Sequence, residues 1–242
     1  MFSNLGGRGS VHMVIDFGPS KLEDRKGEAY LLVGSPGSGK TTTFKRLFES
    51  AFPRILIIDS EDMEFPEFEK VGKLKDMNEL ARAMGSEWKP FKWRWVPPPP
   101  PTKAQLMRAK SKAARLALPD PDREIDQLCR AMLYHTRHVL LYFDEISDFC
   151  SSSYMPRNLK FLYRRARKRG ICVAAGTQRP QAVHKDAWNN SIHKQVFYID
   201  TFDRQYMDRL APGLGEQVAQ IEYGTYRSLY IGKGRTELME AV

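Results

Sequence analysis

The sequence predicts an α/β fold with a mainly parallel central sheet, and three apolar stretches carry that prediction. Residues 29–33 form an apolar run that leads through a glycine-rich loop into a helical stretch ending near residue 50. Residues 53–59 and 139–145 are further apolar runs, and each of them ends on an acid. Short apolar runs bounded by loops and helices are typical of buried parallel strands. At 242 residues the chain is long enough for one substantial core with appendages.

The loop after the first run, residues 34–41, has the sequence Gly-Ser-Pro-Gly-Ser-Gly-Lys-Thr. It matches the phosphate-binding loop motif and lies between a strand and a helix, as that motif requires, although a glycine-rich turn can match by chance. Its main-chain N–H groups and the N-terminus of the following helix attract phosphate. We expect Lys40 to contact the β- and γ-phosphates and the Thr41 hydroxyl to bind Mg²⁺. The residues expected to bind the triphosphate are Gly34, Ser35, Pro36, Gly37, Ser38, Gly39, Lys40, Thr41 and Thr42.

The stretches on either side of this loop are less specific. The N-terminal arm, residues 1–26, contains a strand-like segment at 11–17. Residues 76–84 have apolar side chains at helical spacing, and residues 91–96 alternate apolar with basic side chains, as a half-buried strand does. The two tryptophans of 91–96 either belong to the core, which their spacing of two favours, or form a platform for stacking bases.

A basic, proline-rich insert follows at residues 97–118. Pro97 to Pro101 predict a short, stiff polyproline segment. Residues 102–118 carry five basic side chains and no acid, so they are interpreted either as a DNA-facing or membrane-facing loop or as a solvated helix. Asp120 and Pro121 then predict the start of a helix, because they form an N-cap followed by proline.

The second chemical motif is the pair Asp144 and Glu145 at the end of the apolar run 139–145. In an NTPase with a phosphate-binding loop, Asp144 would hold Mg²⁺ and Glu145 would orient and polarise the attacking water. An apolar strand that ends in Asp-Glu is common, but together with the loop upstream it favours hydrolysis. A small-molecule kinase has reason to keep a water-activating glutamate away from its acceptor.

The third motif is a basic helical stretch, residues 157–169, that Gly170 ends before another apolar run, residues 171–177. Gln178 follows that run. If the run lies between the other two strands, the Gln178 side chain points at the γ-phosphate and can sense it; the alternative is that it caps the strand end.

These motifs resemble the FtsK/HerA superfamily of DNA-pumping ATPases, above all in residues 166–171 and 176–180. Within it, the small size is similar to the genome-packaging ATPases of membrane-containing double-jelly-roll viruses. The resemblance covers about residues 27–212, with the next core strand at 195–200. It implies the P-loop NTPase fold of the RecA-like (ASCE) division, a three-layer sandwich with a mainly parallel central sheet and a C-terminal β-hairpin.

The resemblance also implies the ligands and the roles of matching residues. ATP and Mg²⁺ would be the cofactors, with Lys40, Thr41, Asp144 and Glu145 as the matching Walker residues and Gln178 as the sensor. An arginine before the sensor strand would reach into the neighbouring subunit's site; Arg167 aligns best, and its competitors are Arg164, Arg165 and Arg169. The implied partners are double-stranded DNA, further copies in a hexameric or pentameric ring, and capsid or viral membrane proteins.

The C-terminal residues 213–242 are expected to form a hairpin and a tail. Residues 220–231 are interpreted as a hairpin around Gly224 that completes the sheet edge. Residues 232–235 form a basic glycine loop, interpreted either as a plain exposed tail, which we favour, or as a segment that approaches DNA or the adjacent subunit's phosphates.

Charge and cysteine content indicate which partners and which cellular compartment suit the protein. The 38 Lys and Arg against 29 Asp and Glu give a net charge of +9, which suits a polyanionic partner or an anionic membrane surface. Cys129, Cys150 and Cys172 form neither a disulfide framework nor a zinc pattern and fit a reducing compartment. We find no membrane-spanning run and no signal-peptide core, so we expect a cytosolic protein, which with the viral resemblance implies the host cytoplasm, the virion or both.

Three other functions remain open. The first is a conjugation or filamentous-phage assembly ATPase of the same superfamily. The second is a nucleotide-binding regulatory or structural protein in which hydrolysis is incidental. The third is the small-molecule kinase.

Overall fold

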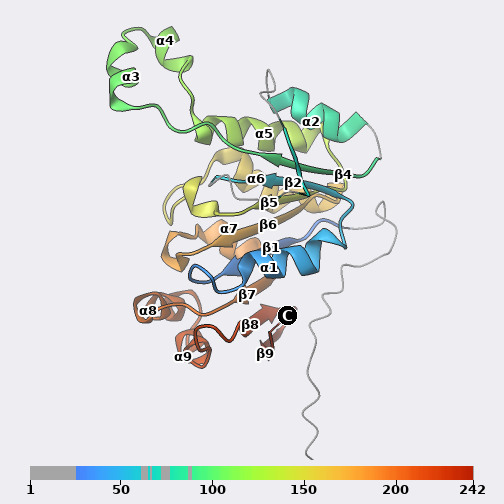
Figure 1. Cartoon of the computed structure of the whole chain (residues 1–242), viewed down its shortest axis with the longest axis vertical. Coiled ribbons are helices and arrows are strands. Elements are labelled where there is room, and N and C mark those ends of the chain that lie inside the picture. The colour runs from blue at the N-terminus through green and yellow to red at the C-terminus, as the bar shows by residue number, and fades with distance from the viewer. Residues whose placement is uncertain (1–25, 61–64, 66, 72–76, 87–88, 242) are drawn as a thin grey trace, which may run out of the picture.

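The computed structural model describes residues 26–60, 65, 67–71, 77–86 and 89–241. The predicted N-terminal arm and its strand at 11–17 lie outside these residues. The described chain forms one sheet in the order β3-β4-β2-β5-β6-β1-β7-β8-β9 (Figure 1). Its strands are β1 (Ala29–Val33), β2 (Arg54–Ile58), β3 (Glu69–Lys70), β4 (Phe91–Trp95), β5 (Leu140–Phe143), β6 (Cys172–Thr177), β7 (His193–Val196), β8 (Ser228–Gly232) and β9 (Arg235–Met239).

The sheet is parallel from β3 to β7, and β8 and β9 add an antiparallel hairpin at one edge. The predicted fold class is thereby confirmed. The connecting helices are α1 (Lys40–Phe44), which continues as a π-helical turn (Lys45–Glu49), α2 (Met77–Ser86), α3 (Lys103–Arg108), α4 (Lys112–Leu116), α5 (Pro121–His135), α6 (Arg157–Arg165), α7 (Lys185–Asn190), α8 (Thr201–Leu210) and α9 (Leu214–Ala219).

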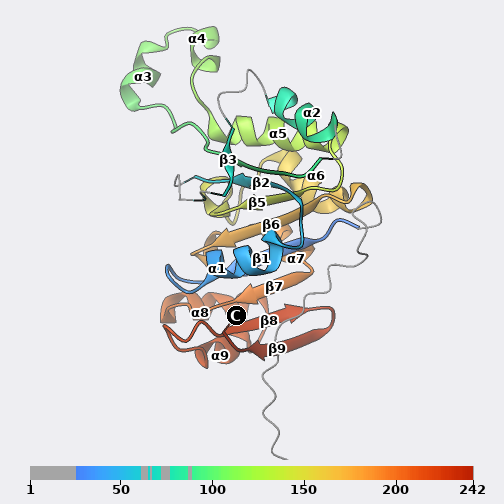
Figure 2. The same ribbon diagram turned by 45° about the vertical axis from the view of Figure 1, so that its right-hand side comes forward.

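Successive side chains of each strand point to opposite faces of the sheet, and the apolar ones form two cores, one on each face. Leu31 points into the larger core, which the buried faces of α2, α5, α6, α7, α8 and α9 complete. Tyr30 and Leu32 point the other way, into an aromatic core under α1 with Phe44 and Phe48. Phe44 stacks on Tyr142 of β5 with ring centroids 3.7 Å apart. Figure 2 shows α1 in front of the sheet, and the three layers follow from this arrangement.

The central strands bring three loops to one end of the sheet, the end formed by the carboxyl ends of its parallel strands. β6 lies between β5 and β1, as expected for a strand inserted between the two motif-bearing strands. Val33 pairs with Thr177, and Phe143 pairs with Ala175. Because all three strands are parallel, the loops that follow them start side by side at their carboxyl ends.

The predicted C-terminal hairpin around Gly224 is wrong in its position. The hairpin is β8 and β9, and its turn lies at Lys233 and Gly234, both with positive φ (48° and 78°). Two consecutive left-handed residues match the right-handed twist of paired strands, which a lone Gly224 (φ 80°) does not. Residues 232–235 therefore complete the sheet edge rather than form a tail.

Other boundaries differ by smaller amounts. The strand expected at 195–200 is β7, which begins at His193 and ends at Val196. The basic stretch 157–169 is α6 followed by a 3-10 turn (Ala166–Arg169), and Gly170 ends it with φ 65°. Tertiary hydrogen bonds, which sequence patterns do not contain, set these ends.

The proline-rich insert projects from the body of the molecule (Figure 1). Helices α3 and α4 have no buried residues. Trp95 of β4 is buried, and Trp93 packs against the core, which favours the core interpretation of both over a base-stacking platform. None of the helices in the described part of the chain is long and apolar enough to cross a bilayer.

Candidate nucleotide-binding site

The loop between β1 and α1 has a backbone that requires glycine. Gly37 and Gly39 have positive φ values of 70° and 105°, which side-chain-bearing residues rarely adopt. A Cβ atom on Gly34 would lie 2.6 Å from Ser38 Oγ and 2.7 Å from Phe197 Cβ. The glycine spacing in the sequence therefore reflects the tight curvature of this loop.

Neighbouring strands hold the loop in place. Gly34 N donates to the carbonyl of Thr177 at the end of β6 (3.0 Å), and Ser35 N donates to the carbonyl of Tyr198 after β7 (2.9 Å). The Lys40 ammonium folds back across the loop and donates to the carbonyls of Gly34 (2.6 Å) and Ser35 (3.1 Å). A positive charge is thereby held against the loop.

The donors of this loop fit a triphosphate. Gly39, the N-cap of α1, offers no side chain to cap the first N–H groups of the helix. The Ser38 hydroxyl is buried and has no hydrogen-bond partner within the described residues. Thr41 is half-buried and Thr42 is exposed in the first turn of α1. Phosphate oxygens are the acceptors that such a set of N–H, hydroxyl and ammonium donors takes.

Asp144 follows β5 at the same end of the sheet. The Tyr142 hydroxyl lies 3.3 Å from Asp144 Oδ1, and burial together with this carboxylate raises the pKa of Tyr142 well above its ordinary value. Tyr142 therefore keeps its proton and donates to Asp144. A Cβ atom on Gly176 of β6 would lie 2.4 Å from the Asp144 carbonyl oxygen, so glycine is needed where the two strands approach.

The residues present fit Mg²⁺ only together with a nucleotide. The Thr41 hydroxyl and the Asp144 carboxylate are hard oxygen donors of the kind that Mg²⁺ prefers. Among the described residues no group of three or more His, Cys, Asp or Glu could hold a metal ion. Phosphate oxygens and water would have to supply the other ligands, as is usual for Mg²⁺.

Glu145 is buried, and both of its carboxylate oxygens accept hydrogen bonds. Ser147 donates to Oε1 from its main-chain N (3.0 Å) and from its hydroxyl (2.6 Å). Gln178 N donates to Oε2 (2.8 Å). These contacts fix one orientation of the carboxylate, and a carboxylate with four lone-pair sites can still accept a hydrogen bond from water.

The structure brings Gln178 to Glu145 through its main chain. Its side chain is half-buried and makes no hydrogen bond to another described residue. The sequence indicated a role for the side-chain amide but missed the N–H contact. No residue type could have revealed it, because every residue except proline has a main-chain N–H.

Arg167 lies at the amino end of the parallel strands, whereas the glycine loop lies at their carboxyl end. The Arg167 carbonyl accepts a hydrogen bond from Gly27 N, just before β1 begins, whereas the glycine loop follows the other end of β1. The structure therefore does not bring Arg167 together with Lys40, Glu145 and Gln178 of the same chain.

The three competing arginines have partners within the chain. Arg164 forms a 2.5 Å ion pair with Asp186 of α7. The Arg165 guanidinium lies 4.8 Å from the centroid of the Phe161 ring, and Arg169 donates to the Tyr134 carbonyl (3.3 Å). Arg167 is exposed, and its guanidinium forms no hydrogen bond, ion pair or ring contact with another described residue.

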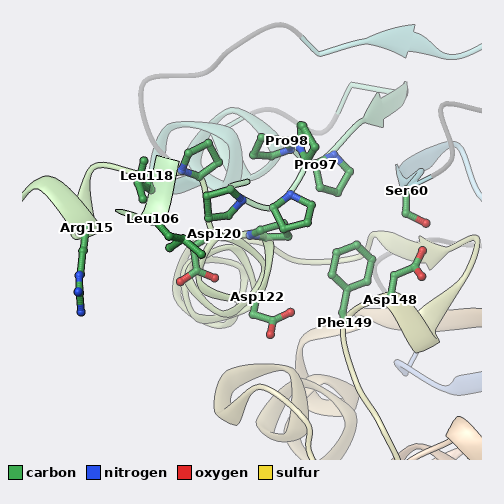
Figure 3. A pocket seen from close by; sticks show the side chains of 15 residues that line it. Ser60, Pro97, Pro98, Leu106, Arg115, Leu118, Asp120, Asp122, Asp148 and Phe149 are labelled. Carbon is green, nitrogen blue, oxygen red and sulfur yellow. The ribbon is translucent and has the colours of Figure 1, made fainter. Parts of the chain in front are cut away.

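A separate hollow of about 550 Å³ lies under the proline-rich insert (Figure 3). Pro97 to Pro101 line it together with Asp120, Asp122 and Asp148, while Arg115 points away. Burial, with Asp120 beside it, raises the pKa of Asp122 above its ordinary value. Because its carboxylates repel anions, this hollow is unsuited to a triphosphate.

The fold and the glycine loop define a P-loop NTPase fold with an extra strand between the two motif-bearing strands. No protein-family model matches the chain, and neither does any curated protein sequence. Solved structures do match it. The genome-packaging NTPase B204 from Sulfolobus turreted icosahedral virus 2, in complex with sulfate, aligns with a TM-score of 0.66 and 15% identity over 90% of this chain and 98% of that one.

Two further matches have the same fold. The DNA-packaging ATPase B204 from Sulfolobus turreted icosahedral virus aligns with a TM-score of 0.61 and 14% identity over 89% of this chain and 98% of that one. The pCW3 conjugation coupling protein TcpA aligns at 0.52 and 14%, over 89% of this chain and 60% of that one. At these identities the likeness establishes the fold, and it confirms the fold that the FtsK/HerA-like motifs predicted.

Proposed function

We propose that the chain is a Mg²⁺-dependent ATPase that moves double-stranded DNA and packages a genome into a preformed capsid. The 2.8 Å hydrogen bond from Gln178 N to Glu145 supports this most directly. Thr177, the preceding residue, accepts a hydrogen bond from Gly34 of the glycine loop. A change at the triphosphate can therefore reach the Glu145 carboxylate through two hydrogen bonds and one strand end. Coupling of this kind suits a motor better than a static nucleotide-binding protein.

The proposed reaction is hydrolysis of the γ-phosphate bond. Water attacks the γ-phosphorus and passes a proton toward the Glu145 carboxylate, the bond from the γ-phosphorus to the bridging oxygen breaks, and ADP and inorganic phosphate are the products. Lys40 supplies positive charge to the β- and γ-phosphates. Thr41 and Asp144 would hold Mg²⁺, which would neutralise part of the phosphate charge.

Assembly into a ring is proposed from the position of Arg167. This arginine lies at the amino end of the parallel strands, whereas the glycine loop lies at their carboxyl end. A neighbouring copy whose glycine loop docks against that amino end would receive Arg167 in its own nucleotide site. A hollow of about 570 Å³ at this amino end is lined by Arg167, Lys194, Lys233 and Arg235 as well as Glu28. Four basic side chains suit a neighbour's polyphosphate.

Contact with DNA is proposed for a second basic hollow, of about 550 Å³, between α5 and α6. Arg130, Arg157, Arg165 and Arg169 line it, and none of them pairs with a carboxylate of the described residues. Arg157 and Arg165 both lie over the Phe161 ring, 5.4 and 4.8 Å from its centroid. Arginines held in this way suit phosphodiester oxygens without reading bases. We name these four residues the arginine hollow.

A strand-displacement assay tests the motor directly. A third strand annealed to duplex DNA should be displaced by the wild-type chain with ATP and Mg²⁺, and not with a non-hydrolysable analogue or with Glu145→Gln. If the third strand stays bound while ATP is hydrolysed, the chain is an ATPase that does not translocate along DNA, and the proposal is wrong.

A further inference from the structure

Two exposed tyrosines lie against the glycines of the loop. The Tyr223 hydroxyl is 3.3 Å from the position that a Cβ atom on Gly37 would take, and a carbon of the Tyr226 ring is 3.3 Å from the equivalent position on Gly39. Tyr223 is 64% exposed and Tyr226 is 55% exposed. Single exposed aromatic rings are ordinary on protein surfaces, but two beside one phosphate-binding loop indicate that both contact the same ligand.

The segment that carries them is fixed at both ends. Ile221 and Ser228 are buried on either side of it. Between them, the Thr225 hydroxyl donates to the Glu222 carbonyl (2.7 Å). Tyr226 has a φ of 54°, which is uncommon for an aromatic residue and persists only where the surroundings impose it. The backbone that carries the two rings is therefore held in position before any ligand arrives.

A second contact orients Tyr223. Its ring packs edge to face against Tyr198, with centroids 5.2 Å apart and planes at 71°. The Arg204 guanidinium lies 5.6 Å from the Tyr198 centroid. Tyr198 also accepts the hydrogen bond from Ser35 N, so this cluster is tied to the loop.

We propose that Tyr223 and Tyr226 form a stacking platform for the purine base of the nucleotide whose phosphates the loop holds. The inference rests on the proposed function, since it assumes a nucleoside triphosphate at the loop. Aromatic rings stack on any base, and a purine offers more ring area than a pyrimidine. The platform therefore selects purine over pyrimidine and contributes little to the choice between adenine and guanine.

Calorimetric titration of the full chain tests this with four probes: ATP, GTP, CTP and inorganic tripolyphosphate. We expect ATP and GTP to bind about tenfold or more tighter than tripolyphosphate, with CTP between. Tyr223→Ala and Tyr226→Ala should remove most of that advantage and leave tripolyphosphate affinity unchanged. Tyr223→Phe and Tyr226→Phe should retain it, and Tyr154→Ala, at a 49% exposed tyrosine elsewhere, should have no effect.

The outcomes separate the two proposals. If neither ATP nor tripolyphosphate binds, the proposed function fails. If both bind and the alanine variants weaken ATP and tripolyphosphate equally, the tyrosines shape the loop and the platform is wrong. Unchanged ATP affinity in both alanine variants also overturns it, while leaving the nucleotide site intact.

Discussion

The main-chain N–H of Gln178 donates a 2.8 Å hydrogen bond to Oε2 of Glu145, and this contact joins the ends of β6 and β5. Ser147 holds the other carboxylate oxygen. The carboxylate that we propose to activate water is thus oriented from two sides. One side belongs to its own loop, and the other belongs to the strand that also anchors the glycine loop through Thr177.

Glu145→Gln should retain ATP binding and lose hydrolysis, because the amide keeps the size of the side chain but cannot take up a proton. We expect the rate to fall by about 10²–10⁴-fold. Phosphate release and nucleotide binding, measured on the same preparation, check this. Ser147→Ala is a matched control that removes one donor and leaves the carboxylate, so its loss should be much smaller. Hydrolysis by Glu145→Gln at the wild-type rate would remove Glu145 from the chemistry.

Arg167→Ala and Lys40→Ala should each abolish activity alone and partly restore it when mixed. In a mixed ring, an intact glycine loop from one copy can meet an intact Arg167 from its neighbour. We expect each single variant to lose about 10³-fold or more. ATP hydrolysis of the mixture is the measurement, and the control is Lys168→Ala, at the exposed neighbour of Arg167 in the same 3-10 turn, which should keep its activity when assayed alone. Failure of the mixture to recover, with rings formed, would contradict a role for Arg167 in a neighbouring site.

Alanine at Arg130, Arg157 or Arg165 should weaken DNA binding without altering its sequence preference, because the arginine hollow is proposed to contact phosphates. Each lost contact should reduce the slope of log affinity against log salt by about 1. Binding titrations at several salt concentrations measure this slope. The control is Arg209→Ala. Arg209 is exposed on α8, which lies toward the β8–β9 side of the sheet and away from α5 and α6, so its loss should leave the slope unchanged. Equal effects of all four variants would mean that net charge, not this hollow, holds the DNA.

Asp186 should make stability depend on pH. Burial would raise its pKa, but Lys160 (2.9 Å) and Arg164 (2.5 Å) outweigh burial and hold it below the ordinary value of 3.8. A depressed pKa stabilises the fold above that value, and the contribution is lost as the pH falls through the folded-state pKa.

Asp186→Asn should therefore lower the free energy of unfolding by about 1–2 kcal/mol at neutral pH, a modest loss because the Arg164 side chain is 46% exposed. The difference from wild type should shrink below about pH 4. Urea unfolding at both pH values measures it, with Glu216→Gln on α9 as an exposed control. A difference that is constant with pH would show that the aspartate acts through packing rather than charge.

The sequence predicted those parts of the site whose residue types are tied to their geometry. Gly37 and Gly39 adopt left-handed backbone, and such conformations leave a mark in the sequence because few other residues tolerate them. The acids after β5 and the existence of β6 followed from apolar runs that end in polar residues, whereas the place of β6 between β5 and β1 was expected only for the class of P-loop fold that has an inserted strand. The fold class followed in the same way.

What the sequence could not predict depends on contacts between distant segments. Gly224 and Gly234 both have positive φ, and only strand pairing shows that Gly234 lies in the hairpin turn. Four arginines before β6 competed for one role in the sequence, with Arg167 favoured only by the resemblance, and it is the ion pair of Arg164 with Asp186 that separates Arg164 from the exposed Arg167. Tyr226 lies nearly two hundred residues after the loop it touches, and no local pattern links them.

We propose above that ATP hydrolysis at the glycine loop serves movement along DNA. The rate of ATP hydrolysis by the wild-type chain, with and without linear duplex DNA, tests it most directly at concentrations where the chain self-associates. DNA should raise this rate, and Arg167→Ala should remove the stimulation. A rate that linear duplex DNA leaves unchanged under every condition in which the chain oligomerises would contradict it.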